Sequence, residues 1–299
     1  MDGSWSHTAP SDRTTGAAGR ALRPAPAECP ATSLCDDGWV PDWVVDLDGV
    51  VWLGHQPVPG SADALADRVA LGERVVFCTN NSSERGVDKA ATLVDHGLAP
   101  GVEVVTSADA VARLVDPSWR VLCLGGIGLR EVLAEVAAEV VDASDGPGSV
   151  GVDAVVVGLA REVDYARIDH AARAVRDGAV FLASNDDATF PADDGLHPGC
   201  GAIVAAVRTA AGVDPVVAGK PHRPMADLLR ERLPGGGVVV GDRPDTDGRL
   251  AAALGWPFVL VLSGVTRPDD LPVDVPTACV APDLATAVAA LDDWLPRGS

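Results

Sequence analysis

Short apolar runs recur along this chain from residue 42 onward, and a segment of helical length follows most of them. The runs, in order, are 43–45, 74–78, 154–157, 180–183, 238–240 and 258–262. Because Val, Leu and Phe occupy nearly every position of a run, both faces of each strand should be buried, which is typical of parallel sheets covered by helices. The pattern therefore predicts an α/β fold with a doubly wound parallel sheet.

The segments between the runs carry helical signals. Ser61 is placed to cap a helix over 62–69. Apolar residues at helical spacing predict further helices over 129–136, 165–175 and 225–233. A length of 299 residues suggests about two domains of ordinary size.

Composition excludes several classes of partner. The formal net charge is −20, so the chain should repel both nucleic acid and anionic membrane surfaces. No run approaches the ~18 apolar residues of a membrane-spanning helix, and six cysteines lack the close pairing of a zinc site. Residues 1–38 have no apolar signal-peptide core and are predicted to form a disordered tail. Together these features predict a cytoplasmic protein.

Polar side chains end several of the apolar runs or precede a predicted helix. They are Asp46, Asp48, Thr79, Asn80, Lys220 and Asp242. Each alone is also what a turn or a helix cap would carry. In an open parallel sheet, however, ligands bind beyond the carboxyl ends of the strands, so the set should gather three carboxylates, a hydroxyl and a lysine at one edge.

This set of side chains suits phosphoryl transfer. Carboxylates without a nearby histidine favour Mg²⁺, which binds through one or two carboxylates together with a substrate phosphate. Lys220 and Thr79 can stabilise charge on the phosphoryl group. Asp46 is placed to attack phosphorus and form an aspartyl-phosphate. Asp48 can then protonate the leaving alcohol and afterwards deprotonate the water that hydrolyses the intermediate.

Four segments carry a resemblance to a known family. Residues 46–52 (DLDGVVW), 79–82 (TNNS), 219–221 (GKP) and 241–247 (GDRPDTD) resemble the four ordered motifs of haloacid dehalogenase (HAD) superfamily phosphatases. The likeness is greatest to the NagD-like, p-nitrophenylphosphatase-like branch, subfamily IIA, and extends from about residue 43 to 294. It implies a Rossmann-like catalytic core over 39–119 and 216–299, with an α/β cap inserted over 120–215.

The resemblance also implies roles for the acids and the lysine. Asp46 would be both nucleophile and Mg²⁺ ligand, and Asp48 would be the acid/base and bind the metal through its backbone carbonyl. Asp242 would be the remaining protein ligand, with Asp247 acting nearby or through water. Lys220 would neutralise charge on the phosphoryl group and on the nucleophile.

The cap would exclude water and select the leaving group. The expected selecting segment is 184–198, in which Asn185 is a candidate substrate ligand, as are Thr79, Asn80 and Asn81 in the second motif. The segment holds four Asp residues and no Lys or Arg. This composition favours a neutral, hydroxyl-bearing leaving group such as a glycerol, sugar or nucleoside phosphate. The acids could equally be solvated loop residues, and Arg243 weakens the argument from missing cations.

Several alternatives stay open at this point. The substrate could instead be of the phosphoglycolate or pyridoxal-phosphate type, and a phosphomutase would share the same motifs. A phosphate-binding regulatory module without activity belongs to another class, although no motif residue is lost. A haloacid dehalogenase would use a comparable Asp nucleophile, but it needs neither a second carboxylate at the position of Asp48 nor a metal site. Asp48 and Asp242 therefore argue against that activity. A homodimer formed through the cap is also compatible with the family.

Overall fold

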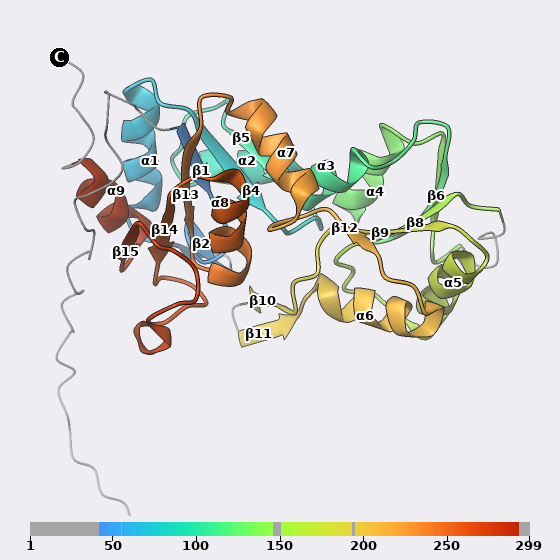
Figure 1. Cartoon of the computed structure of the whole chain (residues 1–299). Coiled ribbons are helices and arrows are strands. Elements are labelled where there is room, and N and C mark those ends of the chain that lie inside the picture. The colour runs from blue at the N-terminus through green and yellow to red at the C-terminus, as the bar shows by residue number, and fades with distance from the viewer. Residues whose placement is uncertain (1–41, 55, 146–150, 193–194, 293–299) are drawn as a thin grey trace, which may run out of the picture.

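Two parallel sheets form the body of the protein (Figure 1). The computed structural model describes residues 42–54, 56–145, 151–192 and 195–292. The predicted tail over 1–38 lies outside these residues. The strands of the larger sheet occur in the order β15-β14-β13-β1-β4-β5, and all neighbours are parallel. Their bounds are β1 (Asp42–Val45), β4 (Val75–Thr79), β5 (Glu103–Thr106), β13 (Gly237–Gly241), β14 (Phe258–Val261) and β15 (Cys279–Ala281).

Helices cover both faces of this sheet, as the continuously apolar strands require. One face packs on α1 (Ser61–Ala70), α2 (Gly86–Asp95) and α9 (Leu284–Asp292). The opposite face packs on α3 (Ser107–Ala112), α7 (Arg223–Arg232) and α8 (Arg249–Leu254). A short antiparallel pair, β2 (Trp52–Leu53) and β3 (Gln56–Pro57), follows β1 directly. The core is thus an α/β sandwich whose strand ends carry the predicted motifs.

The second sheet lies within the chain segment between β5 and α7. Its strand order is β12-β9-β8-β6-β7, again all parallel. The bounds are β6 (Arg120–Leu124), β7 (Glu139–Asp142), β8 (Ala154–Val157), β9 (Val180–Ala183) and β12 (Val216–Val217). Helices α5 (Tyr165–Arg176) and α6 (Cys200–Ala211) cover one face, and α4 (Ile127–Ala134) covers the other. The division at 215/216 stays a prediction, and β12 extends this sheet two residues beyond it.

The core and the insert share one hydrophobic cluster. It includes Val111 of α3 and Met225 of α7 from the core, and Leu129 and Leu133 of α4 from the insert. Helices α3 and α4 contact each other directly. The insert is therefore attached to the core through a packed apolar interface as well as through its two chain connections.

The fold class predicted from the sequence is confirmed, and two local predictions need correction. Ser61 is the first residue of α1 rather than its cap, because its hydroxyl donates to the Val50 carbonyl at 3.1 Å instead of accepting from the helix. The expected selecting segment 184–198, whose composition suggests an irregular loop, contains a hairpin formed by β10 (Thr189–Ala192) and β11 (Gly195–Pro198). None of the described helices combines the length and apolar character that a membrane crossing requires.

Candidate active site

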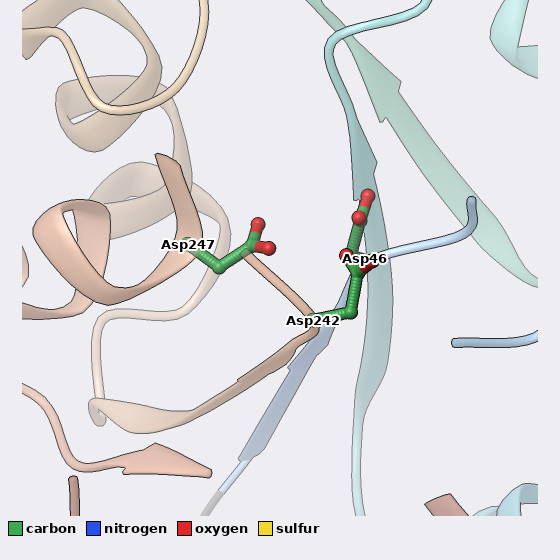
Figure 2. Close-up of side chains that lie close together, drawn as sticks. All are labelled: Asp46, Asp242 and Asp247. Carbon is green, nitrogen blue, oxygen red and sulfur yellow. The ribbon is translucent and has the colours of Figure 1, made fainter. Parts of the chain in front are cut away.

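Three buried aspartates converge at the carboxyl ends of the central strands (Figure 2). Asp46 follows β1 and Asp242 follows β13, two strands that pair in parallel. Asp247 reaches the same point from the single turn of π-helix η2 (Pro244–Gly248). One carboxylate oxygen from each residue lies within 4.8 Å of the others. Strand pairing therefore fixes two of the acids, and the turn after β13 brings in the third.

Lys220 joins the carboxylates from the loop between β12 and α7. Its ammonium donates to Asp46 Oδ1 at 2.8 Å, to Asp247 Oδ1 at 2.6 Å and to the Cys78 carbonyl at 3.0 Å. These contacts use all three of its N–H groups. Burial alone would lower the pKa of Lys220, but the charges of Asp247 and Asp46 outweigh it and hold that pKa well above its ordinary value. The lysine is therefore a fixed cation.

The crowded acids resist ionisation. Burial raises the pKa of Asp46 well above its ordinary value, and the Lys220 charge opposes that rise. Burial and the neighbouring Asp247 raise the pKa of Asp242 to about 7. Since three carboxylates meet a single ammonium, an excess of negative charge remains when all are ionised. A bound cation would offset this excess and lower both pKa values.

The residues fit a magnesium ion on structural grounds. Asp242 is fully buried, and its Oδ2 accepts from the Val265 N–H at 2.5 Å. Its Oδ1 is buried without a hydrogen-bond partner anywhere in the described part of the chain. Such an orphaned carboxylate oxygen is costly unless a ligand completes it. Glycines are required around it, because a Cβ at Gly49 or Gly264 would overlap the Asp242 carboxylate. Carboxylate oxygens are the ligands that Mg²⁺ prefers.

Asp48 is not part of this group of carboxylates. Its Oδ1 accepts from the Trp52 indole at 3.1 Å, and its Oδ2 accepts from the Thr79 hydroxyl at 3.3 Å. The Thr79 hydroxyl in turn accepts from the Asn81 N–H at 3.0 Å. Asp48 is thereby held beside the cluster rather than inside it. Its role as a metal ligand through the backbone carbonyl stays a prediction.

Asp247 lies close to the other two acids. Its carboxylate belongs to the same group as those of Asp46 and Asp242, and its expected role near the ligands or through water stays a prediction. Its Oδ2 also accepts from the Arg243 N–H at 3.2 Å. Gly241 allows this approach, since a Cβ there would overlap the Asp247 side chain. Asp247 is therefore both a partner of Lys220 and a candidate ligand.

The amide of Asn80 binds protein groups. Its Oδ1 accepts from the Lys220 N–H at 2.7 Å, while its Nδ2 donates to the Lys220 carbonyl at 3.0 Å and to Asp187 Oδ1 at 2.9 Å. Asn185 is engaged similarly, because its Nδ2 donates to the Asn80 carbonyl at 2.6 Å and its Oδ1 accepts from the Asp187 N–H. Both residues were predicted to hold substrate. The structure gives them contacts that tie the insert to the loop of Lys220.

A small cavity of about 50 Å³ lies against these side chains. All the predicted site residues except Asp242 and Asp247 contribute to its wall, and the remainder comes mostly from the insert, with Arg243 and Thr246 from the core. Its lining includes Asp46, Asp48, Thr79, Asn80, Asn81, Asn185, Asp187, Lys220 and Arg243. The size suits a phosphoryl group better than a whole substrate.

Two charged lining residues lie outside the predicted set of site residues. Asp187 faces the cavity from the insert, and burial raises its pKa to about 6. Arg243 faces it from the core, donates to the Thr189 carbonyl at 3.2 Å and pairs with Asp245. Arg243 lies inside the fourth motif, so its position was a usable signal. Asp187 was one of four similar acids in its segment, and only the three-dimensional contact with Asn80 distinguishes it.

Comparison with known proteins is consistent with this geometry. Residues 43–139 match the family model described as haloacid dehalogenase-like hydrolase, and residues 217–287 match one described as HAD-hydrolase-like. A D-glycerol 3-phosphate phosphatase of Mycobacterium tuberculosis is 41% identical over 74% of this chain, and the match spans 63% of that relative. An acid sugar phosphatase of Staphylococcus saprophyticus is 31% identical over 84% of this chain and 97% of its own.

A solved structure shows the same fold. The glycerol phosphate phosphatase of Mycobacterium tuberculosis, determined in complex with magnesium, superposes with a TM-score of 0.72 at 39% identity. The superposition covers 82% of this chain and 76% of that one. The resemblance drawn from the four motifs is therefore confirmed. The chain belongs to the family of haloacid dehalogenase-like hydrolases.

Proposed function

We propose that this phosphatase hydrolyses small phosphomonoesters of neutral, hydroxyl-bearing alcohols, of the glycerol- or sugar-phosphate type, with Mg²⁺ as its metal. The observation that carries the proposal is the group formed by Asp46, Asp242, Asp247 and Lys220 beside a cavity of phosphoryl size. The names of the relatives, a glycerol 3-phosphate phosphatase and an acid sugar phosphatase, support the substrate type.

Asp46 acts as the nucleophile. When bound, Mg²⁺ supplies positive charge for the phosphate oxygens and keeps the carboxylates ionised at neutral pH. The contact of Lys220 with Oδ1 of Asp46 fixes the side-chain orientation and favours its charged form. An Asp46 oxygen attacks phosphorus, the bond from phosphorus to the ester oxygen breaks, and an aspartyl-phosphate results.

Asp48 handles the proton. The Trp52 indole and the Thr79 hydroxyl hold its carboxyl group beside the cavity, outside the carboxylate cluster. Asp48 donates the proton to the departing alkoxide and then removes one from the water that attacks the aspartyl-phosphate.

The decisive experiment replaces Asp46 by Asn in the full chain. Asp46→Asn should abolish release of inorganic phosphate from glycerol 3-phosphate and from p-nitrophenyl phosphate, with an unchanged circular dichroism spectrum. Asp245→Asn is the matched control, because within the described ranges this exposed acid pairs only with Arg243, and it should keep activity within about a factor of three. Turnover by Asp46→Asn at the wild-type rate would refute the nucleophile assignment.

Other predictions from the sequence are open to separate tests. Phosphoglycolate and pyridoxal phosphate belong in the same substrate panel, and an alcohol acceptor in the assay would reveal phosphotransfer. An inactive binding module would bind phosphate without turnover. The cytoplasmic setting and a homodimer through the insert stay proposals, which fractionation and sedimentation would examine.

A further inference from the structure

We infer that Lys89 and Arg161 are specificity-determining residues in a separate leaving-group cavity, which fits a neutral polyhydroxylated group of sugar size. The inference rests on the proposed function, since it assumes that a phosphoryl group occupies the smaller cavity. It goes further by assigning residues outside the four motifs, one from the core helix α2 and one from the loop that follows β8.

The cavity adjoins the site on the side of Asp48. Its volume is about 470 Å³, and it shares Asp48, Asn81, Phe190 and Pro191 with the phosphoryl cavity of about 50 Å³. An alcohol that takes its proton from Asp48 would leave in this direction. The volume falls within the range of small-molecule sites, roughly 300 to 1,000 Å³. It has room for a leaving group well beyond the three carbons of glycerol.

Lys89 presents a buried ammonium to this cavity. The side chain is about 6% exposed, yet among the described residues its only hydrogen-bonding partner is Glu84, whose Oε2 lies 3.3 Å away and which is itself largely exposed. Within the described residues, two of the three N–H donors of Lys89 therefore have no protein acceptor. A buried charge with unused donors is costly unless another group satisfies them. Oxygen atoms of a ligand are suitable acceptors.

Arg161 faces the same cavity from the insert. Its guanidinium lies over the ring of Phe190, 5.7 Å from the centroid, and the edge of His197 packs against that ring. No carboxylate in the described ranges pairs with Arg161. Stacking on Phe190 orients the planar guanidinium at little entropic cost and leaves its N–H groups available to a ligand.

The charges of the wall favour a neutral ligand. Two acids, Asp48 and Glu84, balance the two cations, Lys89 and Arg161. A second phosphate or a carboxylate would want an excess of positive charge, which this wall lacks. Hydroxyl groups both donate and accept, so they can use the acids and the cations together.

Aromatic rings complete the match to a sugar. Trp52 and His96 form a pair on the core side, with ring centroids 6.0 Å apart, and Phe190 lies on the side of the insert. Such rings offer apolar surface to the C–H face of a sugar, while the polar groups bind its hydroxyls. The rings and the balanced charges together indicate a sugar phosphate as substrate.

The test compares substrates that share the phosphoryl group and differ in the alcohol. Wild type, Arg161→Ala and Lys89→Met are assayed with Mg²⁺ on glucose 6-phosphate, 3-phosphoglycerate and p-nitrophenyl phosphate. Each substitution should lower kcat/KM for glucose 6-phosphate about ten- to a hundredfold, the loss expected for a charged hydrogen bond. For p-nitrophenyl phosphate, which has no hydroxyl on its ring, the change should stay within about threefold. Arg173→Ala, on the exposed face of α5, is the control for removing an arginine from the insert.

Each outcome decides between the two proposals. Equal losses on glucose 6-phosphate and p-nitrophenyl phosphate would overturn the inference, as would 3-phosphoglycerate proving the best substrate of the wild type. The first result leaves the proposed function standing, because hydrolysis of the esters is still seen. The second would also refute the neutral leaving group of the proposed function, while phosphatase activity itself would stand. No hydrolysis of any of the three esters by the wild type would refute the proposed function and the inference with it. Arg161 is exposed, so Arg161→Ala tests the inference independently of any effect of the buried Lys89 on stability.

Discussion

Replacement of Lys220 by Met should destabilise the protein strongly and make its stability more sensitive to pH. The side chain keeps its length but loses two carboxylate contacts, at 2.8 and 2.6 Å, and one carbonyl contact at 3.0 Å. Removing one partner of a buried ion pair typically costs about 3–5 kcal/mol, because the other charges stay buried. For a chain of this size each 1 kcal/mol corresponds to a Tm change of about 2–4 °C.

The pH dependence follows from the acids that remain. Burial holds the pKa of Asp46 above its ordinary value, and Lys220 opposes that rise, so its removal raises the folded pKa further. At pH values between the ordinary and the raised pKa, Asp46 is ionised in the unfolded chain and protonated in the folded chain. Stability then falls as pH rises through this window, by about 1.4 kcal/mol per pH unit for each proton. In the wild type the raised pKa of Lys220 keeps its own contribution present throughout the acid and neutral range.

Urea unfolding followed by tryptophan fluorescence, without Mg²⁺ at pH 5 and pH 8, measures both effects. The sequence contains only one other lysine, Lys89, so Lys89→Met is a matched control. That residue contacts one exposed carboxylate at 3.3 Å, and its loss should cost no more than about 1 kcal/mol. A cost below about 1 kcal/mol for Lys220→Met, or equal costs for both variants at both pH values, would refute the argument.

Three further predictions concern the same region. Gly264→Ala places a Cβ on the Asp242 carboxylate, so the Mg²⁺ concentration needed for a half-maximal thermal shift should rise at least about tenfold. Gly235→Ala is the control, because a Cβ there meets open space and should leave that concentration unchanged. Asp187→Asn removes an acid whose pKa is raised to about 6. The variant should therefore escape the loss of stability that the wild type shows between about pH 4 and pH 6, and at pH 7 be more stable by up to about 3 kcal/mol in urea titrations. Mg²⁺ at a hundred times its Kd should stabilise the wild type by about 2.7 kcal/mol, and Asp242→Asn should lose most of this gain in calorimetry.

The fold was predictable because its strands carry a strong local signal. Runs such as 154–157 and 238–240 are apolar at every position, and only a sheet covered on both faces buries them fully. The hairpin β10–β11 escaped prediction, since Phe190 and Leu196 are separated by one proline, two acids and a glycine, which suggest a loop. Its pairing depends on contacts with the rest of the protein rather than on a local pattern.

The candidate site was predictable where a residue follows a strand directly. Asp46 and Asp242 meet because β1 and β13 are neighbours. The amide contacts of Asn80 could not be foreseen, because its partners Lys220 and Asp187 lie more than a hundred residues away. The inward position of Asp247 depends on the π-helical turn η2, which the sequence alone does not distinguish from an ordinary helix start.

The apolar cluster shared by α3 and α4 has a consequence for how this enzyme could diversify. An insert joined to its host only by two linkers could be exchanged between relatives as a cassette. Here Leu129 and Leu133 of the insert are fully buried in a cluster that also holds Val111 and Met225 of the core. A transplanted insert must therefore bring a complementary α4 surface with it, or α3 must change in step. New substrate preferences should arise more readily by replacing single residues around the cavities, such as Arg161, than by exchanging the whole insert.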